Sequence, residues 1–147
     1  MDHRKLAASL AASLAASLLV ASSAMAAAPE PMRIASEFAS WAGSRQNAEA
    51  LVHGLHNGTS VALATTSPDR RVSLAGFTPG APMSFEEVRE ALAAARSSLA
   101  RLGVRQPDAE QIQAALIGGE VRDRGGRTRM LPGTVAVLGG NPNVASR

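Results

Sequence analysis

Arginine is the residue type whose spacing most clearly suggests a chemistry in this sequence. Residues 120–131 read EVRDRGGRTRML, a pattern typical of two short strands joined at the Gly-Gly pair. A two-residue turn there would pair the arginines across the strands and place all four on one face: Arg122, Arg124, Arg127 and Arg129. Val121 and Met130 would then cover the other face. Guanidinium groups bind phosphate and carboxylate through parallel hydrogen bonds, so the hairpin is predicted to bind anions, with a solvated face as the alternative.

Three other side chains have the chemistry of metal ligands. Glu49, His53 and His56 are spaced i, i+4 and i+7 in a predicted helix over residues 45–57, which places them within about 60° of one another. A carboxylate and two imidazoles suit zinc or copper, so a metal-binding protein or metal-dependent hydrolase of the periplasm is the alternative function. The spacing lacks the H-E-x-x-H signature, and Gly54 weakens a helix. An ordinary solvated stripe explains the same residues.

Groups for covalent catalysis are scarce. The chain has no cysteine, which excludes a thiol nucleophile, and it contains no G-x-S-x-G motif. Of the few aspartates that could orient a histidine, Asp69 is typical of a turn and Asp108 of a helix N-cap. We therefore predict no catalytic residue, no cofactor and no enzymatic activity.

The first 26 residues are typical of a secretory signal peptide. Arg4 and Lys5 precede an apolar region that is short for a bilayer span, and Ala24-Met25-Ala26 has the small-residue pattern of a cleavage site. Cleavage is expected between Ala26 and Ala27, with an uncleaved helical anchor as the alternative. The predicted location is the periplasm or the exterior.

The charge balance argues against a nucleic-acid partner. Cleavage would remove two basic residues and one acidic residue, which leaves 13 basic and 11 acidic residues in the remaining chain. Such a small excess does not produce the broad positive field of a nucleic-acid-binding domain. The expected partners are anionic lipid, lipopolysaccharide or another envelope component. An exported chain without disulfides must also be stabilised by packing alone.

The strongest helix signal lies in residues 84–102. Apolar residues recur there at alternating steps of three and four, which predicts one apolar stripe along about five turns. Ser84 and Glu87 match a capping box, and Gly103 stands where a left-handed C-cap belongs. The stripe is interpreted as a core face, with a homodimer seam through this helix as the alternative.

The remaining segments complete a predicted α+β fold, in which three to four short helices pack with two β-hairpins after a cleaved signal peptide. Further helices are expected from Met32 to before Gly43 and after Asp108. A first hairpin is expected around the turn at residues 67–70, with Thr66 opposite Arg71 and Leu63 opposite Leu74. A last strand is expected at 134–138. The predicted organisation is a mobile leader (27–31), one domain (32–138) and a flexible tail (139–147).

The order of these segments resembles a group of small exported bacterial proteins of uncharacterised function. The likeness covers roughly residues 43–133 and is carried by GSRQNAEALVHGLHNGTSVAL, by PMSFEEVREALAAARSSLARLGVRQPDAEQIQAALIGGEV, and by LPG. Members of that group continue into a segment with glycine and tryptophan, from which this chain differs after Thr134. The resemblance implies export and a helix–hairpin–helix order, and no site residue. The predicted function is an exported, non-enzymatic binding or envelope-support domain.

Overall fold

A computed structural model describes residues 27–137 of the chain. The predicted signal peptide (1–26) and the predicted tail (139–147) lie outside these residues. The elements follow the order α1 (Glu30–Phe38), α2 (Arg45–Asn57), β1 (Val61–Thr66), β2 (Val72–Phe77), α3 (Phe85–Arg101), α4 (Ala109–Ile117), β3 (Gly119–Arg122) and β4 (Thr128–Leu131). Across residues 27–137, no helix has the length and apolar character needed to cross a membrane.

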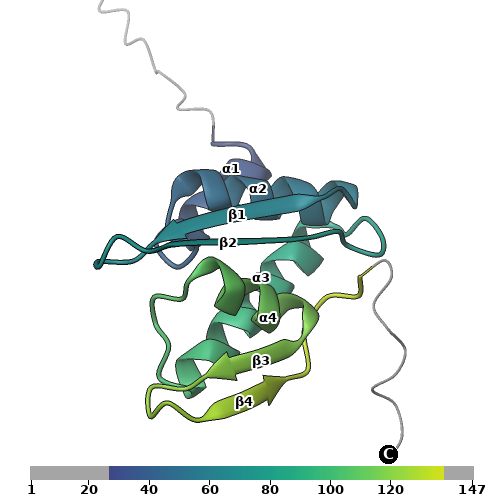
Figure 1. The fold of residues 1–147 in the computed structure, drawn as a ribbon. Coiled ribbons are helices and arrows are strands. Elements are labelled where there is room, and N and C mark those ends of the chain that lie inside the picture. Colours follow the sequence, from purple (N-terminus) through teal and green to yellow (C-terminus); the bar gives the residue numbers. More distant parts are fainter. Residues whose placement is uncertain (1–26, 138–147) are drawn as a thin grey trace, which may run out of the picture.

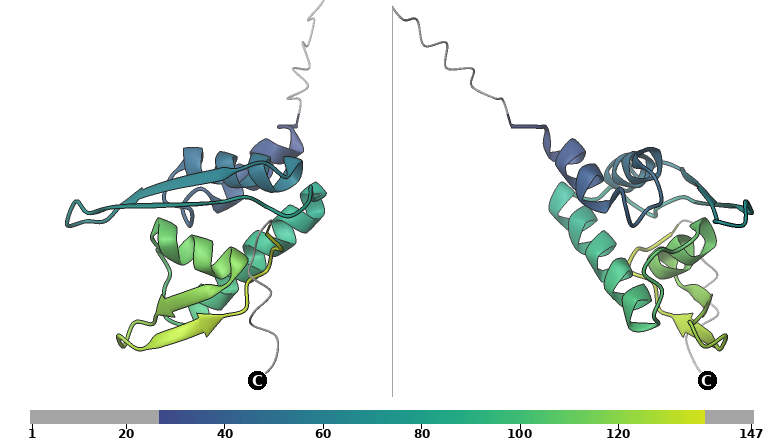
Figure 2. Two further views of the ribbon diagram at one scale, coloured as in Figure 1. Left: turned by 45° about the vertical axis from the view of Figure 1, so that its right-hand side comes forward. Right: turned by 90° about the vertical axis from the view of Figure 1, so that its left-hand side faces the viewer.

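The predicted α+β architecture is confirmed: within residues 27–137, four helices pack with two separate antiparallel hairpins. The β1–β2 hairpin packs with α2 at one end of the molecule, where α1 packs against α2. At the other end, α4 packs with the β3–β4 hairpin and also against β2 (Figure 1). The longest helix, α3, runs obliquely past both groups, and it contacts α1, α2 and α4 (Figure 2). One hydrophobic core joins the two ends.

Local capping fixes the helix ends that the sequence predicts best. Ser84 Oγ accepts a hydrogen bond from the Glu87 N–H (3.2 Å), and Glu87 Oε2 accepts one from the Ser84 N–H (2.7 Å). Asp108 and Gln111 form the same reciprocal capping box at the start of α4. The hydrogen bond from the Ser84 backbone lowers the pKa of Glu87, because it stabilises the charged carboxylate.

The apolar stripe of α3 belongs to the core of this chain. Val88, Leu92, Ala95 and Leu99 are completely buried and join side chains from α1, α2, β1 and α4. A dimer seam along this stripe would need the same surfaces that the fold already covers. The interpretation of the stripe as a core face is therefore the correct one.

The first helix differs from its predicted limits. It begins at Glu30, because the Pro29 carbonyl accepts from the N–H groups of Met32 (3.0 Å) and Arg33 (3.1 Å) and so starts the helix two residues earlier. It ends at Phe38, and residues 39–42 form a turn before Gly43, whose φ of 82° redirects the chain.

Both hairpins have a three-residue connection with its last residue in the left-handed region. In the first, the Ser67 N–H donates to the Arg71 carbonyl (2.9 Å), and Arg70 has a φ of 63°. In the second, the Asp123 N–H donates to the Arg127 carbonyl (2.8 Å), and Gly126 has a φ of 78°. The longer connection shifts the pairing, so the predicted register of each hairpin is wrong by one residue.

In the first hairpin, the observed register moves apolar side chains to the outer face. Leu63 lies opposite Ala75, and Leu74 lies opposite Ala64, so Leu74 is 67% exposed. The pairing is held from the other edge of β1 by the buried amide of Asn47, which donates to the Ala64 carbonyl (2.8 Å) and accepts from the Ala64 N–H (3.2 Å). This long-range contact is not visible in the spacing of apolar residues.

Two further expectations need correction. The strand predicted at 134–138 is an isolated bridge between Pro79 and Val137, because residues 134 and 135 hydrogen-bond instead to the Leu116 carbonyl at the end of α4. Gly54, expected only to weaken α2, permits close packing. A Cβ atom there would lie 2.2 Å from Val61 Cγ2, so only glycine lets β1 approach the helix.

Candidate functional site

The predicted arginine pairs of the second hairpin do not form. Arg122 lies opposite Thr128, and Arg129 lies opposite Val121. Arg124 belongs to the turn, and Arg127 is joined to Asp123 by backbone hydrogen bonding. Because opposed residues share a face and successive residues alternate, the four guanidinium groups are not gathered on one face. The geometric premise of the predicted anion face is wrong, although all four side chains are exposed.

The observed register also removes like-charge pairs. Each strand arginine faces a neutral or acidic residue, so no two guanidinium groups are directly opposed. The role of Asp123 in the turn was not predicted from the sequence. Its Oδ1 atom accepts from the Arg127 N–H (2.9 Å) across the turn, and its position three residues before Gly126 is a signal for this connection.

The tip of the second hairpin is anchored to the C-terminal end of α3. The Arg124 N–H donates to the Leu102 carbonyl (3.1 Å), and a Cβ atom on Gly103 would lie 3.0 Å from Arg124 Cβ. The aliphatic part of the Arg124 side chain therefore packs against Gly103, which follows the C-cap residue of α3. Arg101 and Arg105 are exposed and lie two residues before and after Gly103 in the sequence, and we call them, together with Arg124 and Arg127, the arginine end.

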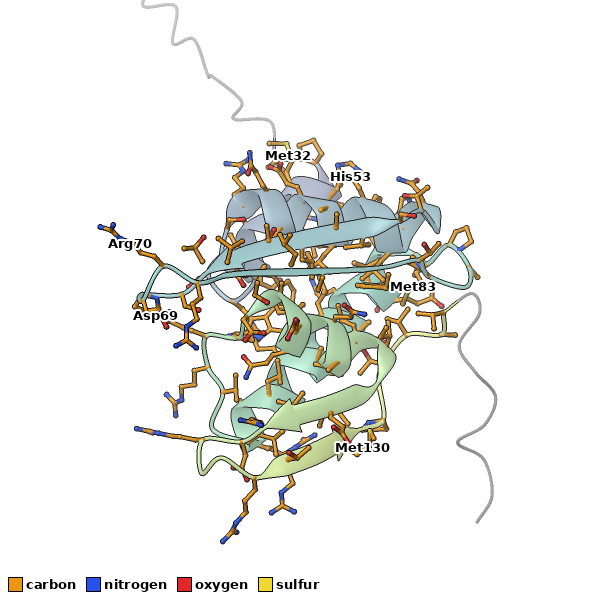
Figure 3. All side chains as sticks on the ribbon, in the orientation of Figure 1. Met32, His53, Asp69, Arg70, Met83 and Met130 are labelled. Atoms are coloured by element: carbon orange, nitrogen blue, oxygen red, sulfur yellow. The ribbon has the colours of Figure 1, made fainter. Side chains whose placement is uncertain are left out.

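Acidic partners are few at the arginine end. Within residues 27–137, no carboxylate forms an ion pair with Arg101, Arg105, Arg124 or Arg127. Asp123 lies 3.7 Å from Arg129, and its pKa is lowered chiefly by the hydrogen bond from the Arg127 backbone, with smaller effects from nearby cations. Figure 3 shows side chains with nitrogen ends extending from the β3–β4 hairpin into solvent.

Arg122 has different surroundings. It lines a concave surface of about 350 Å³ together with Asp108, Glu110 and Glu120. Three carboxylates beside one guanidinium group oppose the approach of an anion. Arg122 is therefore the least suitable of the four predicted arginines for anion binding, and the arginine end does not include it.

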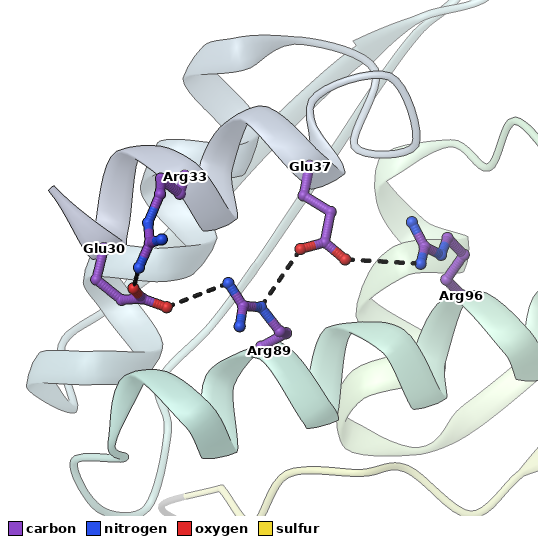
Figure 4. Close-up of polar contacts among 5 residues, drawn as sticks. All are labelled: Glu30, Arg33, Glu37, Arg89 and Arg96. Carbon is purple, nitrogen blue, oxygen red and sulfur yellow. Dashed lines mark hydrogen bonds and ion pairs between the residues drawn. The ribbon is translucent and has the colours of Figure 1, made fainter. Parts of the chain in front are cut away.

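A second group of arginines joins α1 to α3. Arg89 Nη2 lies 3.1 Å from Glu30 Oε1, and its Nε lies 3.3 Å from Glu37 Oε2, an ion-pair distance without hydrogen-bond geometry (Figure 4). Arg33 also pairs with Glu30. Arg96 lies 4.0 Å from Glu37 and stacks 4.6 Å above the Phe38 ring. These cations have partners within the fold.

The three predicted metal ligands do not converge, and two of them are engaged in separate contacts. Glu49 accepts from Arg45 Nε (2.9 Å), and His56 Nδ1 lies 2.8 Å from the Met83 carbonyl while its ring stacks on Phe85 at 3.8 Å. His53 lies on the outer surface of α2, away from Met83 (Figure 3). In the part of the chain that the structure describes, no three His, Cys, Asp or Glu residues form a group able to hold a metal.

Comparisons with known proteins do not assign the chain to a family. No protein-family model matches the sequence, and comparison with curated proteins and with solved structures finds no match. The resemblance to small exported bacterial proteins therefore stays a prediction.

Proposed function

We propose that the protein is an exported, non-enzymatic binding domain that contacts polyanions of the cell envelope through its arginine end. The observation that carries this proposal is the presence of four exposed arginines, without ion-pair partners among residues 27–137, at and near the junction of α3 and the β3–β4 turn. Arginine is suited to phosphate and carboxylate groups because its donors form a rigid fork. Lipid headgroups and lipopolysaccharide phosphates present such groups outside the cytoplasm.

The main alternative is that these arginines serve the fold. Cations near the C-terminal end of a helix stabilise it, because the helix dipole is negative there. Arg101 lies in the last turn of α3, and Arg105 and Arg124 lie just beyond it. This role needs only proximity to the helix end, so it predicts a loss of stability on substitution but no affinity for anionic surfaces.

Vesicle co-sedimentation separates the two roles. The purified protein should sediment with phosphatidylglycerol vesicles and not with phosphatidylcholine vesicles, and binding should fall with salt because exposed charges are screened over about 10 Å at 0.1 M. Replacing Arg124 and Arg127 by serine should weaken binding roughly 30-fold, since each arginine near an anionic surface is worth about 1 kcal/mol. Lipopolysaccharide in place of vesicles tests the second source of phosphate.

A matched control lies at the tip of the first hairpin. Arg70→Asn with Arg71→Ser removes the same charge from the opposite end of the molecule, where Figure 3 shows Arg70 extending from the turn. Asparagine is chosen because Arg70 has a φ of 63°. Equal loss of binding in both double variants would show a dependence on net charge alone, and equal sedimentation with both vesicle types would exclude the proposal.

Export is tested separately. The proposal requires a mature chain that begins at Ala27, and N-terminal sequencing of protein from the envelope fraction measures this directly. Protein that retains Met1 in the cytoplasm would contradict the envelope assignment whatever its affinity for vesicles.

A further inference from the structure

A second candidate site uses different residues from the arginine end, although its residue Gln106 directly follows Arg105 in the sequence. A pocket of about 360 Å³ opens where three segments meet: the turn after α1, the end of β1 with its turn, and the loop before α4. Its polar walls come from Ser40, Thr65, Ser67, Gln106 and Asp108, and Trp41 also belongs to its lining. The volume is near the lower limit of about 300–1,000 Å³ for small-molecule sites, which suits a small ligand.

Trp41 is the least expected feature of this pocket. Its side chain is 5% exposed, and its Nε1–H group is buried without a hydrogen-bond partner among residues 27–137. A buried indole N–H usually has a partner, because leaving it unpaired is unfavourable. Trp41, a residue of the pocket lining, therefore carries a buried donor that no group among residues 27–137 satisfies.

Other polar groups of the pocket retain unused capacity. Thr65 Oγ1 accepts from the Ala109 N–H (2.8 Å), which leaves its hydroxyl proton free to donate. Asp108 Oδ1 caps α4 through the Gln111 N–H (2.9 Å), so its second oxygen remains as an acceptor. In the region that the structure describes, the side chains of Ser67 and Gln106 form no hydrogen bond that would occupy them. Residues with unused donors and acceptors thus line one small volume.

The charge of the pocket narrows the class of ligand. Asp108 is the one ionisable residue in its lining, which disfavours an anion. A single carboxylate with one oxygen already engaged is also a poor cation site, because hard cations require several oxygen ligands. A neutral ligand rich in hydroxyl groups matches the mixture of hydroxyl, amide, indole and carboxylate groups, and Pro68 and Pro107 offer apolar surface to its C–H groups. We propose that this pocket binds a neutral saccharide.

The chain carries its own reporter for this site, since Trp41 is its single tryptophan. Titration of the purified protein with maltotriose and with chitotriose should change the Trp41 fluorescence in a saturable way. Glycerol at the same hydroxyl concentration should not, because it lacks the ring that fills the pocket. Saturation by glycerol, or no saturable change with either oligosaccharide, would overturn the proposal.

Two substitutions test the polar groups without removing a helix cap. Asp108→Asn keeps a good N-cap but removes the charged acceptor, and Gln106→Ala removes an amide. Each should weaken saccharide binding about three- to tenfold, the usual effect of one lost hydrogen bond. Gln46→Ala, on the exposed surface of α2 outside the pocket, is the matched control and should bind as the unsubstituted protein does.

Trp41→Phe tests the indole donor directly. The aromatic volume is largely retained, so thermal unfolding checks that the variant is folded, and ligand-observed NMR replaces the lost fluorescence. Binding that is unchanged in both Trp41→Phe and Asp108→Asn would contradict the assignment of the site. Gln106→Ala and Trp41→Phe keep the charge of the protein, so vesicle binding by the arginine end should be unaffected in these two variants and failure of either proposal is recognised independently.

Discussion

The arginines of the α1–α3 contact and those of the arginine end have the same chemistry in opposite circumstances. Arg89 and Arg96 are about half exposed, yet each lies within 4.0 Å of a carboxylate on α1 (Figure 4). Arg124 and Arg127 are also exposed and have no ion-pair partner among residues 27–137. The two groups differ in whether acids lie opposite them. Carboxylates of α1 pair with Arg89 and Arg96 and make them part of the contact between α1 and α3. Arg124 and Arg127 have no such partner among residues 27–137 and are available to bind an external anion.

This difference changes how a local excess of arginine should be interpreted. Residues 27–137 contain nearly as many acids as bases, so the potential of the molecule depends on where acids lie rather than on how many there are. Arg122 illustrates the rule inside the second hairpin itself, because its neighbours in the concave surface include three acidic residues. The difference between the two groups of arginines can be tested first at α3, the helix that both groups share. It can then be tested at the acids of α1, which pair with only one group.

The largest expected effect comes from α3, the element common to both regions. Leu92→Ala and Leu99→Ala should each destabilise the protein by about 2–5 kcal/mol, because both side chains are completely buried. Urea unfolding followed by Trp41 fluorescence and by far-ultraviolet circular dichroism should show one shifted transition for both probes. A shift in one probe alone would mean that the two ends are independently stable, and an unmoved midpoint would contradict burial of the stripe.

The second effect concerns the acids that neutralise the α1–α3 arginines. Glu30→Gln with Glu37→Gln should cost only about 0.2–1 kcal/mol for each ion pair, because these side chains are partly exposed. The double variant should also gain affinity for phosphatidylglycerol vesicles, since Arg89 and Arg96 lose their partners. Both changes are measured on one preparation by urea unfolding and by co-sedimentation.

The control for this prediction is Glu86→Gln with Glu90→Gln, two exposed acids of α3 outside the network that change the net charge equally. A similar gain in vesicle binding for both double variants would show that pairing is irrelevant and that net charge controls binding. That result would remove the distinction between the two groups of arginines.

How much of this fold the sequence predicts depends on the range of the interactions involved. The limits of α2, α3 and α4 follow from contacts over three or four residues, such as Ser84 with Glu87, and these predictions are confirmed. The hairpin registers depend on one extra turn residue each, and apolar alternation did not reveal it. In the first hairpin, the sequence does not indicate the left-handed residue of the connection, because arginine rarely adopts that conformation as Arg70 does. In the second, Asp123 followed by Gly126 is a pattern that indicates a three-residue connection.

The candidate sites were less predictable because they combine distant segments. The arginine end requires the contact between Arg124 and Gly103, and the saccharide pocket requires Trp41 to meet Gln106 and Asp108. No spacing within one helix or strand contains this information. The sequence identified four hairpin arginines as chemically interesting, but it could not assign Arg122 to an acidic surface or add Arg101 and Arg105 to the group.

The smallest expected effect lies at Asp123, which pairs with Arg129 and also accepts a hydrogen bond from the backbone of Arg127, a member of the arginine end. Its pKa is lowered from an ordinary value of 3.8, mainly by the Arg127 N–H. A carboxyl group with a lowered pKa in the folded state contributes stability that is complete above 3.8 and is lost as the pH falls through the folded value. Hydrogen exchange of the Arg127 amide should therefore accelerate, relative to the intrinsic rate, as the pH is lowered below 3.8.

Asp123→Asn isolates this contribution from that of Glu87, whose pKa is also lowered. Asparagine keeps an acceptor for the Arg127 N–H but cannot titrate, so the variant should lose the acid-dependent change at Arg127 while that of the α3 N-terminus persists. Its vesicle binding at neutral pH should increase slightly, because a carboxylate beside Arg127 and Arg129 has been removed. An identical acid response in both proteins would mean that Asp123 does not hold the turn through its charge, and the arginine end would then owe its geometry to the Arg124 contact with α3 alone.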